Sequence, residues 1–339
     1  MSTSIWTTVD FDRPGKQTGD LWLPHSVHRS AYGNLTIPIA VVKGGEGPTL
    51  LLTGGTHGDE YEGPIAFRRL LRSLEPSELR GRLIVLPALN APAVRAGSRV
   101  SPEDGGNLNR AYPGEPFAGP TAAIAHYVSS VLLPMADYYH DAHAGGSSLT
   151  YLPFVSIRRS GKPALDEAAL AAARAYGAPN IQIWGYSPDP RLSTAEANRQ
   201  KVVSLGGEFG GAGTVSRRGV ALVERGVRRL LAHWDMMAPA PQDGSPGGGP
   251  ETRVVEARVV EVCGRDYYVY ARRGGIFAPA VDLGDSVEGG QLCGEVWGLE
   301  DIADAPHPEH FSRAGIVMCL RHPGLVQKGD CLAHLATPV

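Results

Sequence analysis

Short apolar runs alternate with amphipathic stretches over residues 49–234, and this alternation constrains the fold more than any other feature. The apolar runs have the length of buried strands; they are Thr49–Thr53, Arg82–Leu89, Ala136–Asp141, Ile181–Trp184 and Lys201–Ser204. The stretches with helical spacing are Glu60–Leu71, Pro120–Leu133, Ala164–Tyr176 and Arg217–Trp234. Strands that alternate with helices form a sheet with helices on both faces. The sequence therefore predicts an α/β fold with a mixed, mostly parallel sheet.

A change of composition near residue 240 divides the chain in two. Residues 238–251 are rich in Pro, Gly and Ser and lack apolar periodicity, which is typical of a flexible linker. We therefore expect a catalytic domain over 1–237, a linker over 238–251, and a second domain over 252–339.

The second domain contains short Val-rich strands, Gly turns and a weak internal repeat. The pattern V-x-x-G-[QD] occurs at Val287–Gln291 and again at Val326–Asp330. Two such hairpin units predict a small β-barrel or sandwich that resembles the biotinyl/lipoyl-carrier barrel. The lysine of this region, Lys328, lies in a different context from a carrier lysine, so we expect no attached cofactor arm.

Composition excludes several classes of protein. The formal net charge of −3 lacks the basic excess of nucleic-acid-binding proteins and of polybasic membrane anchors. No apolar run reaches the ~18 residues that a membrane span needs, and residues 1–15 lack the features of a signal peptide. The four cysteines (Cys263, Cys293, Cys319 and Cys331) form no C-x-x-C pair, and we expect them to be reduced core residues. These features predict a cytoplasmic protein that interacts with neither nucleic acid nor membrane.

The first candidate site follows the run Thr49–Thr53. His57 and Glu60 are three residues apart on a Gly-rich turn, and ligand sites gather at such carboxyl ends of parallel strands. One imidazole and one carboxylate at this spacing can bind the same ion, and catalytic zinc commonly has two His and one Glu as ligands. Taken alone, H-x-x-E is a weak motif, and a capped helix start is its more frequent origin.

A second candidate cluster ends the run Ala136–Asp141. Asp141 and His143 share one face of the strand because they are two residues apart, whereas His140 points to the opposite face and is expected to be structural. His143 is a candidate third metal ligand, and Asp141 a candidate to orient a ligand. A lone histidine here is also consistent with a hydrogen-bonded core residue.

Glu208 lies among five glycines after the last apolar run. Gly lets the backbone approach a ligand closely, so Glu208 is a candidate general base. An exposed carboxylate on a flexible loop explains this stretch alone equally well. A phosphate-binding loop is disfavoured, because the stretch lacks the G-K-[ST] ending and the dinucleotide spacing.

Arg99 and the run Asn107–Arg110 supply candidate groups for binding an anionic substrate. Arginine suits bidentate recognition of carboxylates and stabilisation of an oxyanion. A pair of surface arginines is the alternative.

These motifs occur in one order, H-x-x-E, N-x-N-R, D-x-H-x-G-G and E-x-G-G, and together resemble the succinylglutamate desuccinylase/aspartoacylase family. The resemblance covers nearly the whole chain and implies a zinc amidohydrolase with a carboxypeptidase-like α/β domain and a C-terminal β domain. It implies one Zn²⁺ per chain, bound by His57, Glu60 and His143.

The same resemblance implies roles for the other candidates. Glu208 would be the base and later the proton donor, and Arg99 would polarise the scissile carbonyl. Asn109 and Arg110 would hold polar groups of the substrate, chiefly a carboxylate. The implied reaction removes an acyl group, chiefly acetyl, from a small N-acyl amino acid such as N2-acetyl-L-2,4-diaminobutyrate. A homo-oligomer, either a dimer or a tetramer, is also implied.

Some residues beside the expected site depart from the family pattern. Thr56 stands where Asn is usual, Ala142 and Ala144 flank His143, and Phe209 follows Glu208 where Leu is usual. None removes a ligand or the base, but they leave the acyl group and the amine open. We expect residues 151–200, including Arg158 and Arg159, to line the pocket. A zinc carboxypeptidase and a non-catalytic binding protein remain alternatives.

Overall fold

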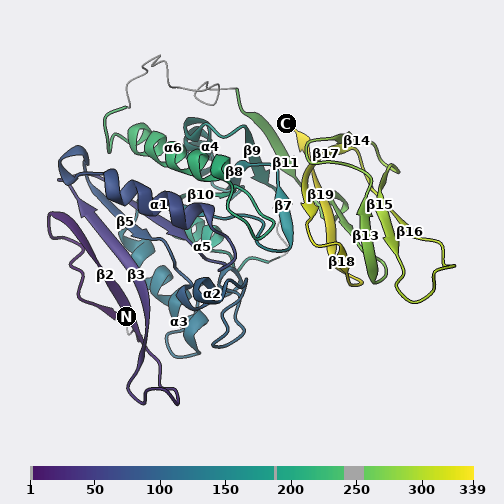
Figure 1. Ribbon diagram of the computed structural model, residues 1–339. Helices are drawn as coiled ribbons and strands as arrows, with labels where there is room; N and C mark the ends of the chain where they lie inside the picture. The colour runs from purple at the N-terminus through teal and green to yellow at the C-terminus, as the bar shows by residue number, and fades with distance from the viewer. Residues whose placement is uncertain (1–2, 187–188, 240–255) are drawn as a thin grey trace.

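The chain folds into a large mixed sheet with helices on both faces, continued by a smaller group of strands at the C-terminal end (Figure 1). The computed structural model describes residues 3–186, 189–239 and 256–339. The expected linker, 238–251, falls almost wholly outside these residues. Within the described ranges, no helix has the length and apolar character needed to cross a membrane.

Four parallel strands at the centre of the sheet overlap apolar runs that the sequence predicted, although the last of them begins two residues later than the predicted run Lys201–Ser204 and ends at Glu208. In order across the sheet they are β5 (Arg82–Leu86), β4 (Thr49–Gly54), β6 (Tyr138–Ala142) and β10 (Val203–Glu208). Almost all of their residues are buried, which explains continuous apolar runs instead of alternation. Because their carboxyl ends lie at one edge, the polar turns after β4, β6 and β10 come together there.

The sheet is mixed, as expected, but "mostly parallel" overstates its parallel part. The long hairpin of β2 (Gly15–Pro24) and β3 (Asn34–Lys43) adds antiparallel strands on one side, and β1 (Trp6–Thr7) extends it. On the other side β8 (Phe154–Arg158) is antiparallel to β10 and parallel to β9 (Asn180–Trp184). Residues 25–33 reverse the chain between β2 and β3, so these strands pair antiparallel, and this hairpin was not recognised in the sequence.

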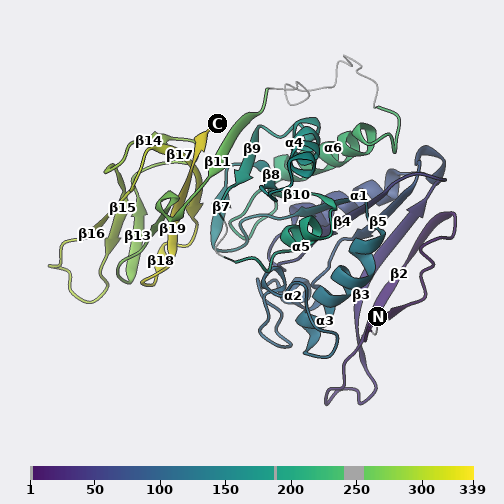
Figure 2. The same cartoon turned by 180° about the vertical axis from the view of Figure 1, so that it is seen from behind.

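Helices cover both faces of the sheet, as expected (Figure 2). One face carries α1 (Glu62–Ser73), α4 (Pro163–Tyr176) and α6 (Arg217–His233). The other carries α2 (Ala91–Ala96), α3 (Pro120–Tyr127) and α5 (Ser193–Arg199). The predicted helix over 120–133 is regular only to Tyr127, and wider and then tighter turns continue it to Met135.

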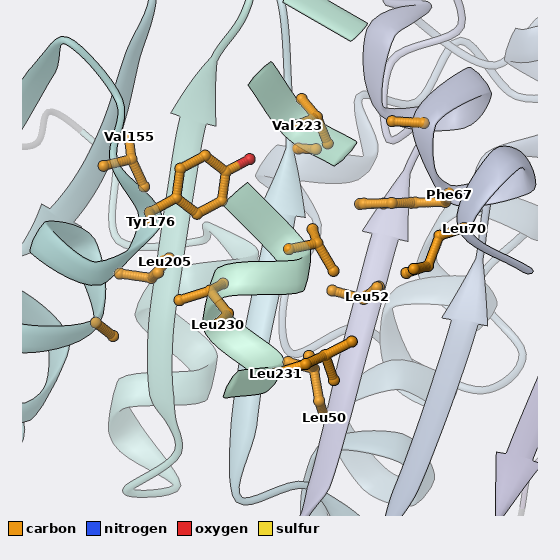
Figure 3. Packing of buried hydrophobic residues seen from close by; sticks show 14 of the residues in the cluster. Leu50, Leu52, Phe67, Leu70, Val155, Tyr176, Leu205, Val223, Leu230 and Leu231 are labelled. Carbon is orange, nitrogen blue, oxygen red and sulfur yellow. The ribbon is translucent and has the colours of Figure 1, made fainter. Parts of the chain in front are cut away.

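The main core lies between the sheet and the face of α1, α4 and α6. Leu52 on β4 and Leu205 on β10 belong to the same buried cluster as Phe67 of α1, Tyr176 of α4 and Leu230 of α6 (Figure 3). This core holds the central strands and their carboxyl-terminal turns in place.

The C-terminal residues form a second set of strands that is hydrogen-bonded to the first. These are β11 (Arg258–Val262), β12 (Tyr268–Tyr270), β13 (Gly275–Pro279), β14 (Ser286–Val287), β15 (Leu292–Trp297), β16 (His307–His310), β17 (Gly315–Arg321), β18 (Leu325–Val326) and β19 (Cys331–Pro338). β11 pairs with β9, and β7 (Leu149–Tyr151) pairs with β17. The large sheet therefore continues into the C-terminal strands, and β16, β15, β13 and β18 form a separate antiparallel sheet.

The internal repeat corresponds to two equivalent hairpin units. Val287 and Val326 are both buried, and four residues later Gln291 and Asp330 each accept a hydrogen bond from a backbone N–H three residues before them (3.0 and 2.9 Å). Each unit pairs a short strand with a strand of the other unit: β14 pairs with β17, and β18 pairs with β13. The sequence repeat is thus a structural repeat.

All four cysteines are free, as expected. Cys293 and Cys319 are buried and Cys331 is partly buried, but Cys263 is exposed. The prediction of four core cysteines is therefore wrong for Cys263, which directly follows β11 where the strand has ended.

Candidate active site

A cavity of about 750 Å³ lies where the carboxyl ends of β4, β6 and β10 meet. The C-terminal strands also line it, through Tyr268, Tyr270 and His334. The family resemblance implies that the C-terminal domain crowds the cleft, but sequence reasoning did not identify these residues, because they carry no motif.

The loop after β4 and the end of β6 bring His57, Glu60 and His143 together. His57 Nδ1 is 2.6 Å from Glu60 Oε1, and His143 Nδ1 is 2.8 Å from Glu60 Oε2. The loop passes close to α2 because Gly58 has no Cβ; a Cβ there would lie 1.9 Å from a backbone oxygen. One ligand atom from each residue lies within 4.8 Å of the others, so these three side chains could hold a metal ion.

Hydrogen bonds to the far side of each ring suit this set to a metal ion. His143 Nε2 is 2.9 Å from Asp141 Oδ2, and His57 Nε2 is 3.2 Å from Asn107 Oδ1. A neutral imidazole that donates from Nε2 keeps a lone pair on Nδ1, and both Nδ1 atoms face Glu60. The donor set therefore fits a divalent ion with two nitrogen ligands and one carboxylate.

Burial and the neighbouring charges shift the pKa values of Glu60, His57 and His143. Burial opposes ionisation of Glu60, but the neighbouring His57 and His143 outweigh it and hold the pKa of Glu60 below its usual value. Burial also lowers the pKa of His57. It disfavours the charged form of His143 too, but Asp141 and Glu60 raise the pKa of His143 well above normal. A metal ion would replace the proton that His143 shares with Glu60.

Asp141 is held by hydrogen bonds from four side chains. Its Oδ1 accepts from Thr53 and Thr56 (2.8 and 2.9 Å), and its Oδ2 accepts from Ser193 and His143 (2.7 and 2.9 Å). Burial would raise the pKa of Asp141, but the charge of His143 and these hydrogen bonds lower it to about 2. Asp141 is thus a fixed anion that sets the orientation of the His143 ring.

Glu208 ends β10 beside His143. The backbone N–H of His143 donates to Gly207, and that of Phe209 donates to His143, both at 3.0 Å. The Oε2 of Glu208 is buried without a hydrogen-bond partner. Burial, with the charge of Glu60, raises the pKa of Glu208 to about 8. Such a carboxyl group can accept and return a proton near neutral pH.

Arg99, Asn109 and Arg110 also line the cavity. Arg99 Nη1 is 3.6 Å from Glu60 Oε1, and its side chain is 44% exposed, so it can reach a bound molecule. Asn109 Oδ1 accepts from the backbone N–H of Ser193 (3.0 Å), which fixes its amide. Arg110 donates to the backbone oxygen of Asn109 (2.7 Å). The structure thus brings the three candidate ligands, Glu208, Arg99, Asn109 and Arg110 to one cavity, with Asp141 behind His143.

Several supporting residues were missed in the sequence. Thr53 and Ser193 hold Asp141, but each lies far along the chain from it and carries no motif. Asn107 begins the N-x-N-R motif, but its contact with His57 was not predicted. Of the two arginines expected at the pocket, Arg158 lines the cavity. Arg159 does not, because it points away and pairs with Glu261 (2.9 Å).

His140 faces away from the cavity, as expected. It is fully buried in the helix-side core, and its ring lies near those of Phe67, Tyr176 and Phe209. Its role is structural.

The chain matches known proteins over almost its full length. Residues 46–234 match the family model of the succinylglutamate desuccinylase/aspartoacylase catalytic domain. The N-alpha-acetyl-L-2,4-diaminobutyric acid deacetylase of Halomonas elongata is 38% identical over 336 residues, which cover 99% of this chain and 95% of that protein.

Solved structures agree. The product-bound ectoine utilization protein EutE (DoeB) of Ruegeria pomeroyi superposes with a TM-score of 0.93, at 37% identity over 99% of both chains. A succinylglutamate desuccinylase/aspartoacylase from Rhodobacter sphaeroides superposes with a TM-score of 0.91, at 39% identity over 99% of this chain and 100% of that one. With these matches and the His-Glu-His cluster in place, the chain belongs to the succinylglutamate desuccinylase/aspartoacylase family.

Proposed function

We propose that this protein is a zinc-dependent amidohydrolase that removes an acyl group, chiefly acetyl, from a small N-acyl amino acid. The observation that carries the proposal is the position of Glu208. A carboxyl group with one buried, unpaired oxygen and a raised pKa lines the same cavity as the cluster of His57, Glu60 and His143. A hydrolase of this type needs a proton acceptor beside a metal ion.

Zinc suits the donor set, with His57, Glu60 and His143 as its ligands. Two imidazoles and one carboxylate, with a further position open to the cavity, are typical of catalytic zinc. Bound there, one zinc ion per chain supplies Lewis-acid chemistry, which polarises a carbonyl group and makes water more acidic.

The residues around the ligands transfer the proton, stabilise the developing charge and bind the substrate. Glu208 takes a proton from the attacking water and returns it to the leaving nitrogen. Arg99 donates hydrogen bonds to the amide oxygen as negative charge develops on it. Asn109 and Arg110 hold further polar groups of the substrate, and Asp141 keeps His143 in place.

N2-acetyl-L-2,4-diaminobutyrate is the first candidate substrate, because a relative with 38% identity is a deacetylase of that compound. One observation favours a second candidate, an acidic N-acyl amino acid. Among the described residues that line the cavity, the carboxylates are Glu60 and Glu208, and both lie at the catalytic end. No other carboxylate of this lining is present to pair with the side-chain ammonium of the diaminobutyrate compound.

A substrate panel tests the proposal. The zinc-loaded protein is mixed with N2-acetyl-L-2,4-diaminobutyrate, N-acetylaspartate and other N-acyl amino acids, and acetate release is measured. Release from any of them supports the deacylase, and the ranking identifies the amine. Hydrolysis of peptides alone would point to a carboxypeptidase, which the wall formed by Tyr268 and Tyr270 disfavours. Binding without turnover would point to a non-catalytic protein.

Replacing Glu208 by Gln tests its role directly. We expect turnover to fall about 10²- to 10⁴-fold, because the amide cannot accept the proton. Zinc content, measured by atomic absorption, should stay at one ion per chain, because Glu208 is not a ligand. Substantial activity in E208Q, or loss of zinc, would contradict the assignment.

Three broader features complete the proposal. A homo-oligomer, either a dimer or a tetramer, is supported by an exposed apolar stripe of Ile276, Trp297 and Leu325, which are neighbours in register. Light scattering tests it.

A cytoplasmic location is supported by the four free cysteines. We keep the division into a catalytic domain over 1–237 and a β domain over 252–339, which limited proteolysis would test.

A further inference from the structure

Glu62 is a buried acid beside the metal ligands that the proposed reaction does not use. It is the first residue of α1, two residues after Glu60, and it is only 1% exposed. It does not line the cavity, so it does not touch a substrate there. A carboxylate buried away from water is costly unless its oxygens are hydrogen-bonded. The contacts of Glu62 therefore show what it stabilises.

The carboxylate of Glu62 holds the segment that follows Glu208. Its Oε1 accepts a hydrogen bond from the backbone N–H of Ser216 (2.8 Å), which is 154 residues away along the chain. The same oxygen lies against the backbone of Gly210, where a Cβ would be only 2.3 Å from it. Gly210 and Ser216 belong to residues 209–216, which join the end of β10 to the start of α6. Glu62 thus connects the helix after the metal loop to the segment after Glu208.

Residues 209–216 have few side chains that could fix their conformation. Phe209 is buried in the helix-side core and stacks on Tyr176, but residues 210–213 are three glycines and one alanine. Glycine loses more conformational freedom on folding than any other residue, so such a segment depends on contacts from outside. Backbone hydrogen bonds with residues 145–151 fix part of it. Among the side chains that the structure describes, only that of Glu62 accepts a hydrogen bond from the backbone of 209–216.

We propose that Glu62 is a positioning residue that fixes residues 209–216 and thereby keeps Glu208 aligned with the metal ligands. The inference rests on the proposed deacylase function, in which Glu208 is the base. Glu208 needs this support because its Oε2 has no hydrogen-bond partner to orient the carboxyl group. A displacement of about 1 Å can reduce the rate of a reaction about 10²-fold. Glu62 therefore acts on the reaction through Glu208.

Four variants separate this role from a role in folding. Glu62→Ala removes the acceptor for Ser216, whereas Glu62→Gln keeps Oε1 and replaces Oε2, which has no partner to lose. Gly210→Ala disturbs the same contact from the opposite segment. Glu224→Ala is the matched control, because Glu224 of α6 also connects to α1 (Figure 1), through a partly exposed ion pair with Arg69 (3.3 Å).

Kinetics of the zinc-loaded variants on the best N-acyl amino acid of the panel test the role. For E62A and G210A we expect kcat to fall about 10- to 100-fold. KM should change by less than about 3-fold, because the groups that bind the substrate stay in place. Zinc content should stay at one ion per chain. E62Q and E224A should keep a kcat close to that of the wild type, and G210A tests the contact if E62A does not fold.

A double-mutant cycle with E208Q distinguishes positioning from folding. If Glu62 acts through Glu208, E62A should reduce the residual turnover of E208Q by less than about 2-fold, because the base is already absent. A role in folding alone would reduce turnover by the same factor in both backgrounds. Equal factors, or wild-type kcat in both E62A and G210A, would overturn the inference.

Hydrogen exchange gives a measurement that does not depend on turnover. The amides of residues 209–216, followed by mass spectrometry, should exchange faster in E62A than in the wild type, E62Q and E224A. If the wild type hydrolyses no N-acyl amino acid, the proposed deacylase fails. Faster exchange in E62A alone would still support the anchoring of this segment by Glu62, and unchanged exchange would overturn it.

Discussion

At the scale of single residues, Asp141 shows how the chain fixes a chemical group. Four side-chain donors hold this carboxylate, and one of them is the ring of His143. The D-x-H spacing indicated in advance that Asp141 and His143 share a strand face. It gave no sign of Thr53 or Ser193, which approach from β4 and α5.

Replacing Asp141 by Asn should weaken metal binding about 10- to 100-fold. The amide cannot accept four hydrogen bonds, so the ring of His143 loses its fixed orientation and tautomer. Competition with a fluorescent zinc chelator measures the affinity. Ser193→Ala removes one of the four donors and should cause a smaller loss. Unchanged zinc affinity in D141N would show that Asp141 serves folding alone.

At the scale of elements, the crossing of α6 and α4 depends on a glycine inside a helix. A Cβ at Gly226 would lie 2.1 Å from a ring carbon of Tyr176, which is fully buried. The amphipathic pattern of residues 217–234 predicted the helix, and α6 confirms it over Arg217–His233. The pattern could not predict which residue faces Tyr176, because that depends on how the two helices cross.

Gly226→Ala tests this packing, because two effects oppose each other. Alanine favours a helix over glycine by about 1 kcal/mol, whereas overpacking costs about 1–3 kcal/mol. The clash is with a buried ring, so we expect the free energy of unfolding to fall, by up to about 2 kcal/mol, in urea titrations. Arg225→Ala, at the neighbouring partly exposed position, should change it by less than about 0.5 kcal/mol. A gain of stability in G226A would contradict this packing.

At the scale of the whole molecule, one hydrogen-bonded sheet joins the two predicted domains. β11 pairs with β9, β7 pairs with β17, and Phe154 of β8 packs in the core of the C-terminal strands. Each part also buries a histidine. Burial lowers the pKa values of His140 and His334 to about 4, although the Nδ1 atom of each ring contacts a backbone oxygen.

These two histidines predict loss of stability in acid. Their pKa is about 4 in the folded state and 6.5 in the unfolded state, so the unfolded chain binds more protons between these values. Stability is therefore complete above pH 6.5 and falls as the pH drops towards 4, by about 2 kcal/mol per histidine at pH 5. Unfolding in urea at pH 7.5, 6 and 5 measures this slope.

His140→Asn keeps an N–H donor but does not titrate, so its slope between pH 7.5 and 5 should be shallower than that of the wild type. The exposed His28→Asn is the control for the loss of one histidine. Equal slopes in H140N and wild type would show that His140 is not protonated on acid unfolding.

The spacing of residues along the chain was sufficient for the α/β class, the helices on both faces, the candidate ligands and the C-terminal repeat. These features are local: periodicity within a segment reports which side of that segment is buried. The order of the motifs then identified the family.

The three-dimensional fold was needed for the rest: the antiparallel β2–β3 hairpin, the support of Asp141, the second wall of the cavity, and Arg158 pointing inward while Arg159 points outward. Each depends on which distant segments meet. A residue's neighbours across a sheet or a cavity are set by strand order and register, which leave no trace at the position of that residue in the sequence.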